Sequence, residues 1–69
     1  MEGTIARLFR EKGFGFIRAS DGDGEREFFF HRSAVRSVAF ESLREGDVVT
    51  FQEDAPSEKG PRAARVELE

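Results

Sequence analysis

The chain contains no cysteine, no tryptophan and no tyrosine, and only two of its 69 residues are proline. Without cysteine it can form neither a disulfide framework nor a thiolate metal site. It also lacks the roughly 20 consecutive apolar residues of a membrane-spanning helix. Its first residues, Met1-Glu2-Gly3-Thr4, provide neither the charged nor the apolar part of a secretory signal. We therefore expect a cytoplasmic protein with no membrane partner.

The length of the chain limits the size of its core. A chain of 69 residues suits one domain, spanning 1–69, and buries only roughly 60% of its unfolded surface on folding. We therefore expect a single small core, marginal stability and, by default, a monomer.

Charge is distributed unevenly along the chain. The net charge of −3 argues against a nucleic-acid partner if it is taken alone, but a binding footprint depends on local charge. The segment from Thr4 to Ala19 has a local charge of +3, because four basic residues outnumber its single acidic residue. The segment is either a basic binding surface or part of a randomly charged exterior. The basic residues are Arg7, Arg10, Lys12 and Arg18.

Apolar and polar residues alternate with a period of two, and no window shows a sustained helical repeat. One short helical or 3-10 turn is predicted at 33–35, with Ser33 as its N-cap. Five short strands indicate a small barrel or a sandwich, and closure into a barrel removes exposed sheet edges. The predicted strands span 3–9, 13–19, 27–31, 47–53 and 62–68.

The segments around the last two strands are also predicted. Polar residues indicate loops at 36–43 and 54–60, with a turn at 44–47 between them. In the fourth strand we expect Val49 and Phe51 to share one face. In the fifth strand the alternating apolar residues are Ala64, Val66 and Leu68.

Phenylalanine is unusually frequent, with eight residues in 69. Eight large rings exceed what so small a core needs, and clusters of exposed aromatic residues mark binding sites. In the second predicted strand Phe14 and Phe16 share one face, whereas the core side holds Ile17 and two glycines. We predict that both rings lie on the outer face of the sheet, in the basic segment.

The run Phe28-Phe29-Phe30-His31 cannot lie entirely in the core of a protein with one core. If Phe28 and Phe30 are inside, Phe29 and His31 are outside. Pairing of the second and third strands would then bring them beside Phe14 and Phe16. Such a platform suits single strands, because stacking a base on an aromatic side chain is worth roughly 1–3 kcal/mol, and nearby Lys and Arg attract phosphate.

The alternative is that these rings belong to the core. We favour the core for Phe28, Phe30 and Phe51, and leave Phe9 ambiguous. Phe40, in a polar loop, is either a lid on the core or an extra stacking ring, and we predict the latter.

No catalytic chemistry is indicated by the sequence. His31 has no serine, cysteine or metal-ligand partner at a useful spacing, and no Gly-rich phosphate loop is present. We therefore expect no enzyme, no metal, no cofactor and no small-molecule substrate. Two rival functions are a protein-interaction module, which a barrel fold also permits, and a nuclease.

The same residues resemble motifs of the cold-shock domain family, over nearly the whole chain from Gly3 to about Val66. Lys12-Gly13-Phe14-Gly15-Phe16-Ile17 is similar to the first ribonucleoprotein motif of the family, and Phe28-Phe29-Phe30-His31 is similar to the second. The order and spacing of further runs add to the resemblance. These runs lie at 33–35, 43–51 and 59–63.

This resemblance implies an all-β fold, a five-stranded antiparallel barrel of the OB type. It also implies binding of single-stranded RNA and DNA, often with a role as RNA chaperone, in transcription antitermination or in cold adaptation. By position, the resemblance assigns base stacking to the two motifs, basic contacts to Lys12 and Lys59, and a loop aromatic to Phe40.

Three positions depart from the family pattern. Typical bacterial members have a Trp-Phe pair late in the first strand, where this chain has Arg7 and Leu8, and an aromatic after the histidine, where it has Arg32. Guanidinium groups also stack on bases and pair with phosphate, so we predict binding with a greater electrostatic share. The expected contacts are Arg7, Lys12, Phe14, Phe16, Phe29, His31, Arg32, Phe40, Lys59 and Arg62.

Overall fold

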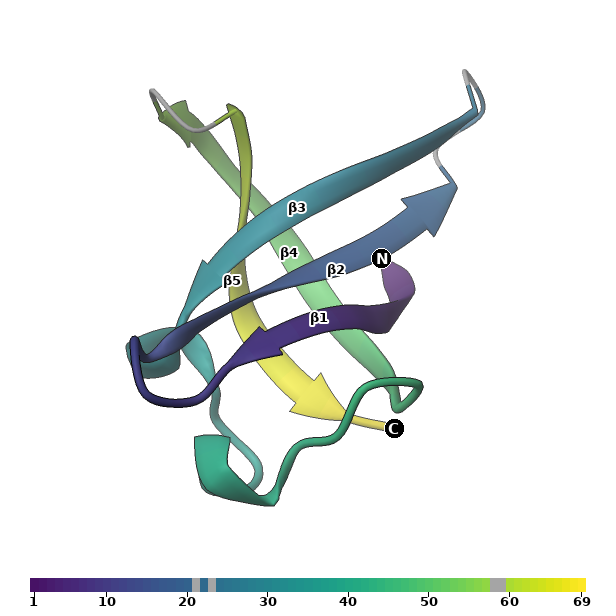
Figure 1. Ribbon diagram of the computed structural model, residues 1–69. Helices are drawn as coiled ribbons and strands as arrows, with labels where there is room; N and C mark the ends of the chain where they lie inside the picture. The colour runs from purple at the N-terminus through teal and green to yellow at the C-terminus, as the bar shows by residue number, and fades with distance from the viewer. Residues whose placement is uncertain (21, 23, 58–59) are drawn as a thin grey trace.

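The computed structural model describes residues 1–20, 22, 24–57 and 60–69, with the backbone alone at 56 and 57. None of these residues belongs to a helix long and apolar enough to cross a membrane. The described elements are β1 (Glu2–Phe9), β2 (Phe14–Ser20), β3 (Glu25–His31), the 3-10 helices η1 (Arg32–Ala34) and η2 (Phe40–Ser42), β4 (Val48–Ser57) and β5 (Gly60–Leu68) (Figure 1).

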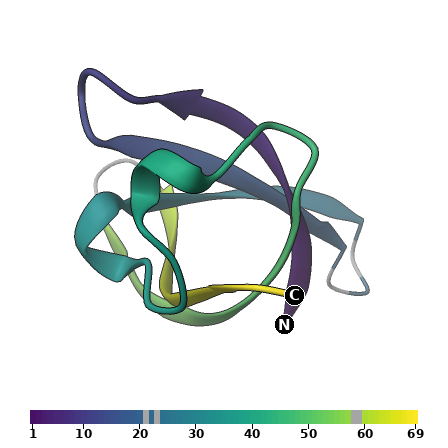
Figure 2. The ribbon, with the colours of Figure 1, turned by 90° about the horizontal axis from the view of Figure 1, so that it is seen from below.

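The strands close into a barrel in the order β1-β2-β3-β5-β4. Neighbouring strands are antiparallel, except that β3 and β5 meet in parallel where Phe29 lies opposite Arg62. Seen from below, the segment that contains η1 and η2 lies across one end of the barrel (Figure 2). The five-stranded barrel expected from the sequence is therefore confirmed.

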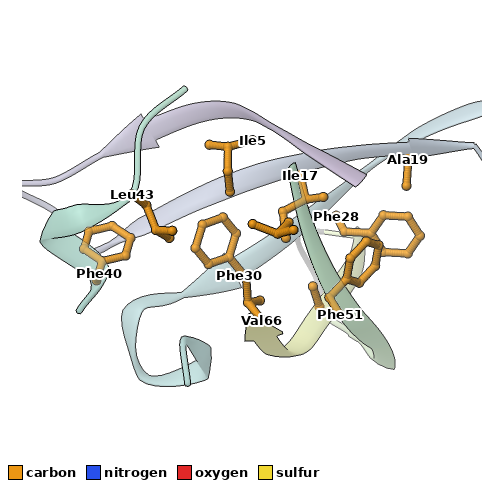
Figure 3. Close-up of a cluster of buried hydrophobic side chains, with 11 residues drawn as sticks. Ile5, Ile17, Ala19, Phe28, Phe30, Phe40, Leu43, Phe51 and Val66 are labelled. Atoms are coloured by element: carbon orange, nitrogen blue, oxygen red, sulfur yellow. The ribbon is translucent and has the colours of Figure 1, made fainter. Parts of the chain in front are cut away.

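One cluster of buried side chains fills the barrel (Figure 3). Phe28 and Phe30 are both fully buried, because alternate residues of β3 point to the same side of the sheet. Phe28 packs against Phe51, with the ring centroids 5.0 Å apart. The core positions predicted for these three rings are confirmed. The remaining buried hydrophobic residues are Ile5, Ile17, Ala19, Phe40, Leu43, Val49, Ala63 and Val66.

A bulge in β1 decides which of its side chains face outward. Ile5 and Arg7 lie opposite consecutive residues of β2, the second of which is Phe16, so Ala6 is an extra residue in the ladder. Without this extra residue, alternation would turn Arg7 to the same side as the buried Ile5. The bulge instead places Arg7 and, two residues later, Phe9 on the outer face.

Residues 43–47 hold the part of β1 that continues beyond its pairing with β4. The backbone N–H of Ile5 donates to the carbonyl of Asp47, and that of Gly46 donates to the carbonyl of Ile5, both at 2.8 Å. Farther along β1, the N–H of Leu8 donates to a Glu45 carboxylate oxygen at 3.2 Å. These hydrogen bonds satisfy backbone groups that an open sheet edge would expose. They also hold the second half of β1 against residues 45–47.

A second irregularity lies in β5, where the register against β4 shifts. Arg65 has a left-handed backbone with a φ of 51°, a conformation that is costly for a residue with a Cβ. The expected alternation of residues 64, 66 and 68 is therefore wrong at residue 64. Val66 is buried together with Ala63, whereas Ala64 is half buried. Leu68 lies opposite the buried Val49 and is 40% exposed at the end of the strand. The extra residue of the bulge turns the following side chains to the other face.

The connections also differ from the predictions. Strand β4 continues to Ser57 and β5 begins at Gly60, so most of the predicted loop 54–60 is strand, and η2 lies inside the predicted loop 36–43. The N-cap of η1 is His31, whose ring accepts a hydrogen bond from the backbone N–H of Ser33 at 3.2 Å. The prediction of Ser33 as the cap is wrong, because Ser33 lies inside the turn.

Candidate nucleic-acid interface

Four phenylalanine rings form a cluster on the outer face of β1, β2 and β3. Phe14 lies between Phe9 and Phe29, with centroid distances of 5.0 and 5.3 Å and interplanar angles of 33° and 38°. Phe16 meets Phe9, Phe14 and Phe29 edge-on, at 6.2, 6.1 and 5.8 Å. All four side chains are half buried, so each ring keeps part of its surface open to solvent. We call these four residues the aromatic cluster.

Strand pairing places an arginine at each end of a row through the aromatic cluster. Arg7 lies opposite Phe16, Phe16 lies opposite Phe29, and Phe29 lies opposite Arg62. The row crosses three strand spacings, which is about 14 Å. Arg7 is exposed and Arg62 is half buried. Two rings between two guanidinium groups suit a chain in which flat bases alternate with phosphates.

His31 lies at the end of β3, opposite Phe14 in the ladder, and is exposed. Its Nδ1 accepts the hydrogen bond from the Ser33 backbone N–H and lies 3.0 Å from Ser33 Oγ. A neutral imidazole that accepts at Nδ1 carries its proton on Nε2. The ring is thus held beside the aromatic cluster with a hydrogen-bond donor at its outer nitrogen.

Arg32 lies against the turn between β1 and β2. Its backbone N–H donates to the carbonyl of Gly13 at 2.8 Å, and its Cδ lies only 3.0 Å from where a Cβ on Gly13 would be. Its guanidinium group is 3.5 Å from the Glu41 carboxylate, and both side chains are exposed. Lys12, in the same turn, has no ion-pair partner among the residues that the structure describes. Lys12 and Arg32 therefore present two cations at this turn, and Glu41 partly neutralises the charge of Arg32.

One of the expected contacts, Phe40, is not part of this surface. Phe40 is 4% exposed and packs against Phe30 in the core, with the ring centroids 6.1 Å apart (Figure 3). Its burial disagrees with the predicted stacking role and favours the alternative, a lid on the core, because η2 lies across the end of the barrel. Lys59 lies outside the described residues.

Phe9 is the member of the aromatic cluster that sequence reasoning did not assign. Simple alternation from the buried Ile5 places Phe9 inside, and only the bulge at Ala6 reverses this. A usable signal was the pair Leu8-Phe9, because only one of two adjacent strand residues faces the core. Leu8 lies opposite Gly15 and packs on the core, which leaves the outer face to Phe9.

The positive charge of this surface is local. Beyond the aromatic cluster, Arg18 forms an ion pair with Glu27 at 3.3 Å. Carboxylates meet at the chain ends, where a side-chain hydrogen bond with Glu2, followed by desolvation and by repulsion between the two carboxylates, raises the pKa of Glu69. A net charge of −3 is therefore compatible with a basic aromatic face.

The family model of the "Cold-shock" DNA-binding domain matches residues 1–69. The chain belongs to the cold-shock domain family. This cold-shock domain is 42% identical over 64 residues to cold shock protein 1 of Lactiplantibacillus plantarum. The matched residues cover 93% of this chain and 91% of that protein.

A second group of relatives shows the same level of similarity. The cold-shock domain is 42% identical over 65 residues to cold shock protein CspA of Staphylococcus aureus and to the CspA of Staphylococcus saprophyticus, in each case covering 94% of this chain and 92% of the relative. Family membership supports nucleic-acid binding. The aromatic cluster and its flanking arginines are the features of this chain that suit such binding.

Proposed function

We propose that this cold-shock domain binds single-stranded RNA and DNA by stacking bases on the aromatic cluster. The observation that carries the proposal is a group of half-exposed rings on β1–β3 with Arg7 and Arg62 at the ends of one row. Every base has a π-face, so stacking accepts any sequence. A duplex does not fit, because its bases are already stacked on each other.

The phosphates would be neutralised by cations at the edges of the aromatic cluster. Arg7 and Arg62 would contact phosphates at the two ends of the row through Phe16 and Phe29. Lys12 and Arg32 would contact phosphates at the turn between β1 and β2. In single strands each neutralised phosphate contributes about −0.7 to the slope of log affinity against log salt. Four contacts therefore give a slope of about −3.

The biological role follows from trapping single strands. Binding that removes unpaired strands from solution melts weak secondary structure without nucleotide hydrolysis, which is the activity of an RNA chaperone and a means of regulating transcription or translation. The names of the cold shock relatives suggest a role in stress response. We expect a cytoplasmic monomer without nuclease activity.

The proposal is tested with a panel of labelled heptathymidine, its RNA counterpart and a matched duplex, each titrated at two salt concentrations. We expect both single strands to bind, the duplex to bind far more weakly, and affinity to fall as salt rises. Equal affinity for the duplex, or affinity for heptathymidine that does not weaken with salt, would contradict it. If the amide resonances that shift on titration with heptathymidine lie away from Phe14, Phe16 and Phe29, the rival function of a protein-interaction module would be favoured. The arginine and lysine residues beside the rings argue against that rival, because charge is depleted at the cores of protein interfaces.

Replacement of Glu41 by glutamine is expected to tighten binding of heptathymidine by up to about fivefold at low salt. Glu41 pairs with Arg32 at 3.5 Å and so competes with phosphate, but an exposed pair is worth only about 0–1 kcal/mol. The gain should disappear at high salt. Glu67→Gln, which removes the same charge from β5, is the control. An equal gain in both variants would assign the effect to net charge alone.

A further inference from the structure

The turn between β1 and β2 contains a small hollow whose lining includes Lys12, the first residue of the first motif, and no described residue of β2 or β3. Its volume is about 350 Å³, and its lining is the continuous stretch from Leu8 to Lys12. Small-molecule sites begin at about this size. The hollow lies beside Phe9, at the edge of the aromatic cluster farthest from β3.

Phe9 extends the aromatic cluster by one strand. Its ring is 5.0 Å from Phe14 at 33° and 6.2 Å from Phe16 at 84°, so it is tilted against one neighbour and edge-on to the other. Its backbone is held as well, because its carbonyl accepts hydrogen bonds from the N–H groups of Lys12 at 3.0 Å and Gly13 at 2.8 Å. A ring fixed in this way loses little freedom when a base stacks on it, which favours affinity.

The charges around the hollow suit a nucleotide. Within the described part of the chain Lys12 has no ion-pair partner and is exposed, so its ammonium group is available to a phosphate. Arg10 is already engaged, because its guanidinium group donates to the carbonyl of Leu43 at 2.6 Å. Glu11 is exposed, and its carboxylate can accept hydrogen bonds from amino groups on the edge of a base.

We propose that Phe9 and the hollow from Leu8 to Lys12 form an additional subsite for one nucleotide, with the base on the Phe9 ring and its phosphate at Lys12. The proposal rests on the single-strand binding proposed above. The Phe9 ring lies two residues beyond Arg7 along β1, which is about 7 Å closer to the turn. Although position 7 is an arginine, β1 therefore still contributes one aromatic ring to the surface, at position 9.

The test uses the absence of tryptophan from the chain. In Phe9→Trp the single indole would report directly on the subsite, since stacking of a base quenches indole fluorescence. We expect labelled heptathymidine to bind this variant, as seen by anisotropy, and to quench its emission. Val48→Trp, at a position on β4 that is 43% exposed, is the matched control, and its emission should not change.

A second variant measures the contribution to affinity. Phe9→Leu keeps an apolar side chain but removes the stacking face, and we expect about fivefold or greater loss of affinity for heptathymidine. A thermal melt shows whether the variant is folded, and Phe9→Trp decides the question if it is not. Lys12→Gln should lower the salt slope by about 0.7.

The outcomes separate this inference from the proposed function. If the unmodified protein does not bind heptathymidine, the proposed function fails. If it binds, but the indole of Phe9→Trp is not quenched at saturation, the subsite is wrong while the proposed function stands. An affinity of folded Phe9→Leu equal to that of the unmodified protein would also overturn the subsite.

Discussion

Phe16→Ala is expected to weaken binding of heptathymidine by roughly tenfold or more, because stacking on one ring is worth roughly 1–3 kcal/mol. Phe16 contacts the other three rings of the aromatic cluster edge-on and lies between Arg7 and Phe29 in the row that crosses the strands. Its removal takes away one stacking face and the lateral support of the others. Anisotropy of a labelled oligonucleotide measures the loss.

The control for this prediction is Val48→Ala. Val48 is a 43% exposed residue of β4, outside the three strands that carry the aromatic cluster. We expect its affinity to equal that of the unmodified protein. A thermal melt of Phe16→Ala must show a folded protein, since the ring is half buried. An unchanged affinity in folded Phe16→Ala would exclude the aromatic cluster as the binding surface.

Gly15→Ala is expected to destabilise the fold by about 1–3 kcal/mol or more, the usual cost of forcing atoms into a packed core. A Cβ at this position would lie 2.7 Å from the carbonyl oxygen of Arg7 and 2.9 Å from two carbons of the Phe30 ring. The Arg7 carbonyl belongs to the neighbouring strand and Phe30 is fully buried, so neither can move cheaply. The loss is a large part of the margin of so small a domain.

Chemical denaturation measures this effect, with Ser20→Ala as the control. Ser20 is an exposed residue at the end of the same strand, and its replacement should change the free energy of unfolding little. A Gly15→Ala protein with unchanged stability would show that the close approach of β1 and β3 around Gly15 does not constrain the sheet. The glycine has no positive φ, so the prediction depends on packing and not on backbone strain.

Much of the proposed binding surface was predictable because strand alternation is a local rule. Three consecutive phenylalanines force Phe29 outward once Phe28 and Phe30 face the core, and the antiparallel pairing of neighbouring strands then brings Phe29 beside Phe16. The contacts at Gly15 show how closely β1 and the Phe30 ring approach this glycine.

The predictions of which side chains are buried were wrong where a bulge interrupts strand alternation, or where the path of a loop determines burial. The bulge in β5 at Arg65 put both Ala63 and Val66 in the core and turned Ala64 away from the face of Val66. Phe40 lies in a segment without periodicity, so its burial depends on where η2 crosses the end of the barrel. Neither feature has a signal within a few residues of sequence.

The sequence by itself determined the β class, the five strands, the rings of β2 and β3 that face outward, and the basic character of the segment that carries Phe14 and Phe16, because each depends on neighbouring residues and on period-two geometry. Only the tertiary structure decided that Phe9 belongs to the aromatic cluster and that Phe40 lies in the core instead. It also decided that an arginine lies at each end of the row through Phe16 and Phe29. These outcomes depend on one extra residue at Ala6 and on the register between strands far apart in the chain. A shift of one residue in register moves every following side chain to the opposite face.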